Sequence, residues 1–155
     1  MRTDLIEVAS DDPLARHKTL NYWRKRIAYE KGLEAGSDEV LCLTSAGFLC
    51  EATRSNVFLV EGRCLRTPAA DGPLLPGIVR QVILERGARL GLDIEETPVP
   101  FDRLAQADEA FLTSSVRAML PIARLMNENL PAPGPLTRRL WNDILSWLQS
   151  GGTAP

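Results

Sequence analysis

A turn that leads into a helix is the first part of the sequence with the chemistry to bind a small molecule. Residues 72–77 include two glycines and two prolines, and apolar residues recur at helical spacing from Ile78 onward. A helix that begins near Gly77 leaves its first backbone N–H groups unpaired, and its dipole adds partial positive charge there. Glycine also allows a ligand to approach the backbone closely. The pattern predicts either an anion site suited to phosphate on Gly77, Ile78 and Val79, or an ordinary helix start.

Two side chains of opposite charge are the next candidates for chemistry. Lys18 follows the only histidine, His17, and precedes a predicted helix whose dipole favours the neutral form of a nearby amine. A neutral amine is the nucleophile in Schiff-base formation, although a solvated surface lysine is the simpler interpretation. Glu51 ends an apolar strand, where its carboxylate either faces a pocket or pairs with Arg54.

Hydroxyl groups cluster after a later predicted strand. Ser114 and Ser115 follow Thr113, and serines at such a position are usually turn formers. His17 has no marked nucleophile or orienting acid near it in sequence, so we predict no Ser-His-Asp triad.

The elements that must position these residues follow from hydrophobic periodicity and from glycine and proline punctuation. The first predicted helix has Thr19 as N-cap, ends between Gly32 and Gly36, and has its apolar face at Leu20, Trp23, Ile27 and Ala28. The other predicted helices cover Gly77–Leu90, Phe101–Ala107 with Asp102 or a neighbour as its cap, and Thr137–Leu148 with Leu140, Ile144 and Leu148 on one side. The predicted strands are an edge strand at Leu5–Val8, two hairpins at 40–50 and 56–66, and strands near 92–95, 109–113 and 119–122, followed by a loop over Asn127–Pro135. We therefore expect a mixed α/β (α+β) domain built mainly from hairpins.

Size and composition bound the function. A chain of 155 residues with 45% hydrophobic content suits one globular domain with its own core. Its 18 basic and 20 acidic residues provide no overall basic field for nucleic acid, and no apolar run reaches membrane-spanning length. Cys42, Cys50 and Cys64 are an odd number without metal-ligand spacing, so we expect buried free thiols, no metal site and a reducing cytoplasm.

Several of these segments together resemble a known family. They are Lys18–Tyr22, the run Glu51–Phe58, the turn Leu75–Ile78, Ala107–Phe111 and Gly134–Thr137. In this order and spacing they resemble the class-IV, fold-type IV enzymes that depend on pyridoxal 5'-phosphate (PLP). That family includes branched-chain aminotransferases, D-amino-acid aminotransferases and aminodeoxychorismate lyases. The resemblance runs from about Arg16 to the terminal helix and implies a hairpin-rich, open barrel-like sheet with flanking helices.

The resemblance also implies a role for each site residue. Lys18 stands at the position of the catalytic lysine, which binds PLP covalently and later moves the substrate's α-proton. Glu51 stands where a glutamate holds a proton on the pyridine nitrogen, which makes the ring an electron sink. The turn residues Leu75, Gly77, Ile78 and Val79 correspond to the backbone phosphate cradle. Ser115 takes the place of a threonine that adds a further phosphate contact.

Two departures from the family pattern bear on function. Val79 stands where many relatives have threonine, so one hydroxyl bond to phosphate, worth about 1.5–3 kcal/mol, is missing. Relatives also carry a whole N-terminal domain before the lysine, whereas only about sixteen residues precede it here. We expect residues 1–16 to be a remnant strand and linker of that domain, 17–150 to be the PLP-binding C-terminal domain, and 151–155 to be a tail.

Three functions remain open at this point. The first is transamination between an amino acid, of the branched-chain type, and a 2-oxo acid. The second is lyase chemistry, which releases pyruvate from aminodeoxychorismate to give 4-aminobenzoate, because the segment 113–118 lacks the Gly-Thr-Ala character of branched-chain transaminases. The third is a truncated, non-catalytic half-domain. Relatives are homodimers, so we expect a homodimer or a separately encoded N-terminal half as partner.

Overall fold

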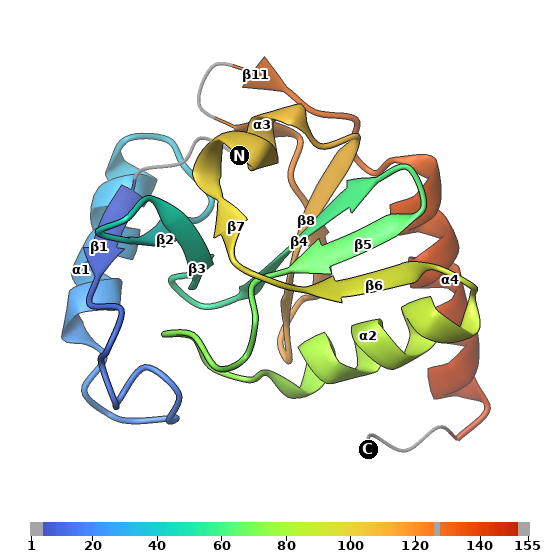
Figure 1. Ribbon diagram of the computed structural model, residues 1–155, viewed down its shortest axis with the longest axis horizontal. Coiled ribbons are helices and arrows are strands. Elements are labelled where there is room, and N and C mark those ends of the chain that lie inside the picture. Colours follow the sequence, from blue (N-terminus) through green and yellow to red (C-terminus); the bar gives the residue numbers. More distant parts are fainter. Residues whose placement is uncertain (1–4, 126–127, 152–155) are drawn as a thin grey trace.

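The computed structural model describes residues 5–125 and 128–151. Its strands form two main sheets, which lie side by side in Figure 1. The four-stranded sheet has the order β1-β2-β3-β7, with β1 at Leu5–Val8, β2 at Leu41–Thr44, β3 at Phe48–Ala52 and β7 at Val99–Pro100. The five-stranded sheet has the order β6-β5-β4-β8-β9, with β6 at Asp93–Glu96, β5 at Cys64–Thr67, β4 at Asn56–Glu61, β8 at Glu109–Ser114 and β9 at Ala118–Pro121. The predicted hairpin-rich α/β fold is confirmed.

Two hairpins give the sheets their register. In the first, β2 pairs antiparallel with β3, and in the second β4 pairs antiparallel with β5. The turn of the first hairpin uses Gly47 at a φ of 79°, and that of the second uses Gly62 at 59°, a left-handed region that glycine enters without steric cost. The predicted edge strand is also confirmed, since β1 pairs parallel with β2 at the outside of its sheet.

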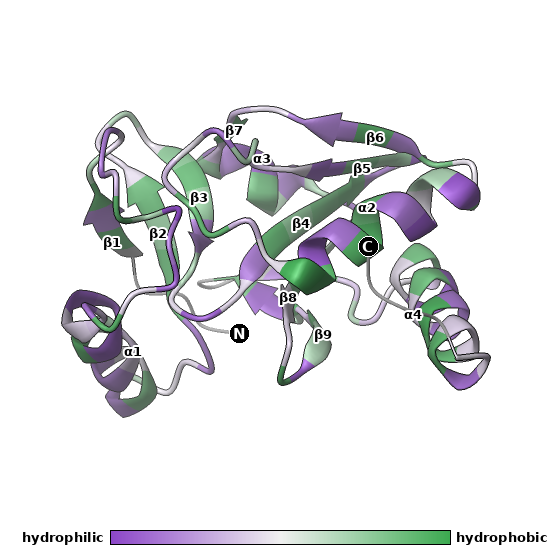
Figure 2. Cartoon of the chain, turned by 90° about the horizontal axis from the view of Figure 1, so that it is seen from below, coloured by the Kyte–Doolittle hydropathy of each residue, from purple (hydrophilic) through white to green (hydrophobic). Residues whose placement is uncertain are grey.

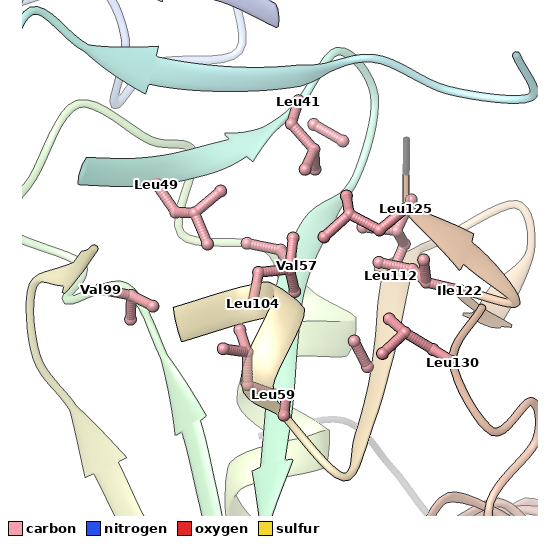
Figure 3. Packing of buried hydrophobic residues seen from close by; sticks show 13 residues of the cluster. Leu41, Leu49, Val57, Leu59, Val99, Leu104, Leu112, Ile122, Leu125 and Leu130 are labelled. Atoms are coloured by element: carbon pink, nitrogen blue, oxygen red, sulfur yellow. The ribbon is translucent and has the colours of Figure 1, made fainter. Parts of the chain in front are cut away.

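Strand β4 shows how one sheet serves two cores. Its side chains alternate, so that Val57 and Leu59 point to one hydrophobic cluster while Phe58 and Val60 point to the other. The first cluster fills the space between the two sheets, where Leu41 and Leu49 of the four-stranded sheet and Leu104 approach it (Figure 3). Because both faces of β4 are covered, it reads as a continuous apolar run in the sequence.

Within the described residues, four helices flank the sheets. They are α1 at Trp23–Glu34, α2 at Ile78–Arg89, α3 at Phe101–Gln106 and α4 at Pro135–Gln149. Helices α2 and α4 pack on the second cluster, where Ile83, Leu140 and Ile144 are buried around the stacked rings of Phe58 and Phe111, whose centroids lie 5.1 Å apart. Helix α1 lies at the far end of the molecule from α4 (Figure 2).

Two local predictions need correction, at the start of the first helix and within the predicted loop, and the structure refines two others. Helix α1 begins at Trp23 with Tyr22 as N-cap, and the Thr19 hydroxyl instead accepts a bond from the Asn21 N–H at 3.1 Å. Asp102 lies in the first turn of α3, whose N-cap is Pro100. Leu148 is half-exposed because α4 extends past the edge of the core. Within the predicted loop, β11 at Glu128–Asn129 pairs with β10 at Arg124–Leu125, while Asn127 lies outside the described residues.

The remaining predictions concern solvent exposure. Cys42 and Cys50 are buried free thiols as expected, whereas Cys64 is only half-buried, on β5 next to the edge strand of its sheet. The predicted apolar face of α1 is mostly uncovered, because Ala28 is buried while Trp23 and Ile27 are exposed. In the part of the chain that the structure describes, no helix has the length and apolar character needed to cross a membrane.

Candidate active site

One cleft, with a volume of about 640 Å³, gathers every residue that the sequence marked for chemistry. They come from the loop before α1, from β3, from the turn before α2 and from the segment after β8, and they are Lys18, Glu51, Leu75, Gly77, Ile78, Val79 and Ser115. Residues far apart in the chain therefore meet in one place, which the order of motifs alone did not establish.

Glu51 is buried at the inner wall of this cleft. Its Oε2 accepts a hydrogen bond from the Leu75 N–H at 3.2 Å, and its Oε1 forms an ion pair with the Lys25 ammonium of α1. The alternative pairing with Arg54 is wrong. The Arg54 guanidinium lies 3.5 Å from the centroid of the Tyr29 ring, and its Nε is 3.5 Å from Oε2 of Glu39.

Burial and neighbouring charges act on Glu51 in opposite directions. Desolvation raises the pKa of the Glu51 carboxyl above its ordinary value, because the charged form loses its hydration. The Lys25 charge, the Leu75 N–H and, more weakly, the Lys18 charge act to lower that pKa. Lys18 and Glu51 both line the cleft, so the amine and the carboxylate share one electrostatic environment.

The turn before α2 is held by two side chains that contact the backbone of a single residue. Glu51 accepts from the N–H of Leu75, and the Asn56 Nδ2 donates to the Leu75 carbonyl at 2.8 Å. A Cβ added to Gly77 would lie 2.3 Å from the Asn56 Oδ1, so a larger residue would displace the Asn56 side chain that holds this turn. Asn56 lies in the Glu51–Phe58 motif, but the sequence assigned it no role. The feature that could have indicated one is a polar residue at the start of a buried apolar strand.

The first turn of α2 opens into the cleft. Gly77 is its N-cap in an extended conformation, and no side chain among the described residues caps it. The leading N–H groups belong to Ile78 and Val79, which line the cleft, so they are available to an anion from outside the chain. The predicted helix with an N-terminus at Gly77 is therefore confirmed, and the turn before it contacts Glu51.

Lys18 and the hydroxyl segment form the outer part of the cleft. Lys18 is exposed, and α1 begins only at Trp23, so the helix dipole does not act directly on the amine. The Ser114 Oγ accepts from the Arg117 N–H at 3.2 Å, which is the expected turn-forming role, while Ser115 is exposed in the cleft. The Thr113 Oγ1 is buried, lines the cleft and has no hydrogen-bond partner among the described residues.

Comparison with known proteins gives this arrangement a family. The family model for aminotransferase class IV matches residues 2–125, which is most of the chain. The chain belongs to the class IV aminotransferase family. Curated relatives include a probable branched-chain-amino-acid aminotransferase from Synechocystis sp., 34% identical over 128 residues, and an aminodeoxychorismate lyase from Bacillus subtilis, 33% identical over 118 residues. Those matches cover 83% and 74% of this chain.

A solved structure of a fold IV-transaminase from Curtobacterium pusillum is similar with a TM-score of 0.83 at 27% identity, and the match covers 91% of this chain and 51% of that one. The matched regions are only 42% of the Synechocystis protein and 38% of the Bacillus lyase. The chain thus spans less than half the length of these curated relatives. Both transaminase and lyase members are PLP-dependent, which agrees with the cofactor expected from the sequence.

Proposed function

We propose that this chain is the cofactor-binding part of a PLP-dependent class IV aminotransferase, which transfers an amino group between an amino acid of the branched-chain type and a 2-oxo acid. Within it, residues 17–150 form the PLP domain, residues 1–16 are the end of an N-terminal domain, and 151–155 are a tail. The observation that carries the proposal is the convergence of Lys18, Glu51 and the uncapped start of α2 on one cleft.

The donors and acceptors in the cleft fit PLP. The cofactor carries a phosphate, a basic ring nitrogen and an aldehyde, and the cleft offers free helix N–H groups, a carboxylate and an amine for them. The partnerless Thr113 hydroxyl is a further buried polar atom that a ligand in the cleft would satisfy.

Each residue then has a defined task. When bound, PLP supplies an electron sink for negative charge at the substrate's α-carbon. The backbone of Gly77, Ile78 and Val79, together with Ser115, binds the phosphate, while Leu75 connects that turn to the ring side through Glu51. Glu51 would hold a proton at the ring nitrogen. The Lys18 Nζ would hold the cofactor covalently, and its free amine would accept the substrate's α-proton as a general base.

The outer side of the cleft is open and leaves a substrate exposed to water. Leu20 is 100% exposed and Trp23 72% exposed beside the cleft, so this chain alone does not desolvate a substrate there. The covering chain is a second copy in a homodimer or a separately encoded N-terminal half. The free thiols of Cys42, Cys50 and Cys64 support a reducing cytoplasm as the compartment.

Lyase chemistry is the second candidate, because the segment 113–118 departs from the branched-chain pattern and an aminodeoxychorismate lyase is among the similar proteins. The two are separated by assaying 2-oxoglutarate-dependent amino transfer against pyruvate release from aminodeoxychorismate. Each assay is run on the chain alone and with a candidate N-terminal half added.

Cofactor binding is tested by absorbance. Adding PLP to the purified chain should produce a visible band distinct from that of free PLP, and borohydride should then fix the cofactor on Lys18. Lys18→Ala should lose the band, whereas Lys31→Ala, an exposed lysine of α1 outside the cleft lining, should keep it. A wild-type chain that gives no band and no fixed cofactor would favour the third function, a non-catalytic half-domain.

A further inference from the structure

Lys25 is a second lysine of the cleft that the sequence motifs did not mark. It lies on the first half of α1, and its ammonium contacts the Oε1 of Glu51 directly. The Glu51 side chain is only 5% exposed and that of Lys25 is 25% exposed, so the pair lies at the inner wall of the cleft rather than at its rim. The carboxylate proposed to hold the ring proton therefore has a cationic neighbour within the same chain.

The two charges determine each other's state. Burial is the largest single influence and acts to lower the pKa of Lys25. The charge of Glu51 and its hydrogen bond, with smaller contributions from Cys42 and Tyr22, together outweigh burial, so the pKa of Lys25 lies above its ordinary value. Burial raises the pKa of Glu51, although Lys25 opposes that effect. The first shift favours the ion pair and the second favours a neutral carboxyl. The direct contact between the ammonium and the carboxylate favours the ion pair, because each charge compensates the other where both are withdrawn from water.

The other titratable groups facing this pair leave Lys25 as the main counter-charge. The Cys42 thiol on β2 and the Cys50 thiol on β3 have pKa values raised by burial, and burial also raises the pKa of the Tyr22 hydroxyl before α1. All three are therefore neutral at pH 7. Lys18 acts on Glu51 as well, but as the weakest of the influences named for it. Glu39 adds a carboxylate beside Tyr22 and Cys42.

Glu51 keeps room for one more donor. A carboxylate offers about four acceptor positions, and two are occupied here, one by the Lys25 ammonium and one by the Leu75 N–H. A protonated ring nitrogen would be a third donor. An ammonium that already neutralises the carboxylate weakens the attraction between that carboxylate and a ring proton, since the two cations repel each other across it.

We propose that Lys25 is a positioning residue that holds Glu51 ionised and shares that carboxylate with the ring nitrogen of PLP, thereby lowering the ring's hold on its proton. This inference rests on the proposed function, because it assigns Glu51 to the ring. Lys25 would thereby limit how strongly the PLP ring in this cleft withdraws electrons. Lys25 itself does not touch the reacting atoms.

The test compares Lys25→Met with Lys25→Arg, which keeps the charge, and with Lys31→Met, which removes an exposed charge from the same helix. In the PLP-free chain, carbon NMR follows the Glu51 carboxyl, assigned with Glu51→Gln. Lys25→Met should raise its titration midpoint by about one to three pH units, the effect of losing an opposite charge in contact. The other two variants should stay near wild type. Lys25→Gln replaces Lys25→Met if the latter does not fold.

The second readout is the dissociation constant of PLP as a function of pH, measured by absorbance. The midpoint of this profile should move to higher pH in Lys25→Met and return toward wild type in Lys25→Arg. Two results for Lys25→Met would overturn the proposal that Lys25 and the ring nitrogen share Glu51. One is an unchanged titration midpoint of the Glu51 carboxyl. The other is a midpoint that moves while the pH profile of the PLP dissociation constant stays the same. A wild-type chain that binds no PLP would overturn both the sharing and the proposed function. The carboxyl titration distinguishes that case, because it needs no cofactor.

Discussion

Helices α2 and α4 begin in the same way, but their N-termini lie in different surroundings. Helix α4 starts after Gly134 and α2 starts after Gly77, both glycines in an extended conformation without a capping side chain of their own. At α4, the buried Glu109 carboxylate accepts the N–H of Leu136 and of Thr137, each at 2.8 Å. At α2, no side chain of the described residues takes that place, and the turn faces the cleft.

The difference shows that the N-terminus of a helix needs hydrogen-bond acceptors, which come either from the chain itself or from a ligand. The leading N–H groups of any helix need acceptors, and an anion satisfies them best because of the helix dipole. The fold supplies an anion of its own from β8 to the start of α4, which becomes part of the core. No side chain of the described residues provides such an anion to α2. An anion that satisfies α2 has to come from outside the chain, and the phosphate of PLP is the one proposed here.

The largest effect is expected from removing the Glu109 carboxylate that caps the start of α4. Glu109→Gln replaces one acceptor oxygen with an amide nitrogen that faces a backbone N–H, in a site where the residue is 4% exposed. Losing a charge-assisted bond and leaving a donor unpaired should lower the free energy of unfolding by about 3 kcal/mol. Denaturant unfolding measures this. Glu85→Gln, on the exposed side of α2, is the control and should stay within about 0.5 kcal/mol. Equal losses in the two variants would contradict the capping role.

The same two helix starts show how far the sequence predicts the fold. The helix at Gly77, the two hairpins and the strands of the core were predictable because glycine punctuation and side-chain alternation are local signals. The cap on α4 was not predictable. Glu109 reads as an ordinary strand residue, and only the packing of β8 against α4 brings its carboxylate to the helix. The exposed apolar face of α1 was misread for a related reason, because periodicity does not identify the polypeptide that covers a face.

The site was predictable to a similar extent. Lys18, Glu51 and the turn at 75–79 were found through short motifs, and the structure brings them into one cleft. Lys25 was not found, because a lysine inside a helix of mixed polarity resembles any solvated lysine. Asn56 was part of a motif but had no role until its bond to the Leu75 carbonyl was seen. Both contacts join segments separated in sequence, so no local pattern reports them.

The second prediction makes the uncapped start of α2 resemble the start of α4. Helix α4 carries proline at its first position, Pro135, and Ile78→Pro would copy that arrangement at α2. Proline removes one leading N–H but fits the first turn, and Gly77 already has the extended φ of −71° and ψ of 143° that a following proline favours. Stability should change little, because Ile78 is exposed.

The affinity for PLP should instead fall about tenfold in Ile78→Pro, the effect of one lost bond to a charged group at about 1.5 kcal/mol. Absorbance titration measures it. Ile78→Ala is the control, because it removes the same side chain and keeps the N–H. An unchanged affinity in the proline variant, or an equal loss in both variants, would mean that this N–H does not hold the phosphate.

The smallest effect concerns the ion pair that joins the two helices, and its size depends on pH. The Arg86 guanidinium of α2 binds the Asp143 carboxylate of α4 through two bonds of 2.6 Å and 2.8 Å. These bonds, together with the Arg86 charge, hold the pKa of Asp143 below its ordinary value. A carboxyl with a lowered pKa in the folded state releases its proton more readily there than in the unfolded chain. Its contribution is therefore complete above the unfolded pKa of about 3.9 and is lost as pH falls through the folded one.

Asp143→Asn should accordingly lower the free energy of unfolding by about 1 kcal/mol at pH 7, since the pair is partly exposed and screened. The difference from wild type should shrink as the pH is lowered below 4. Asp71→Asn, on an exposed loop, should show no such trend. A deficit that persists unchanged into acid would mean that Asp143 acts through packing rather than charge. In that case α2 would be fixed against α4 by the core alone, and the orientation of its open N-terminus would not depend on this ion pair.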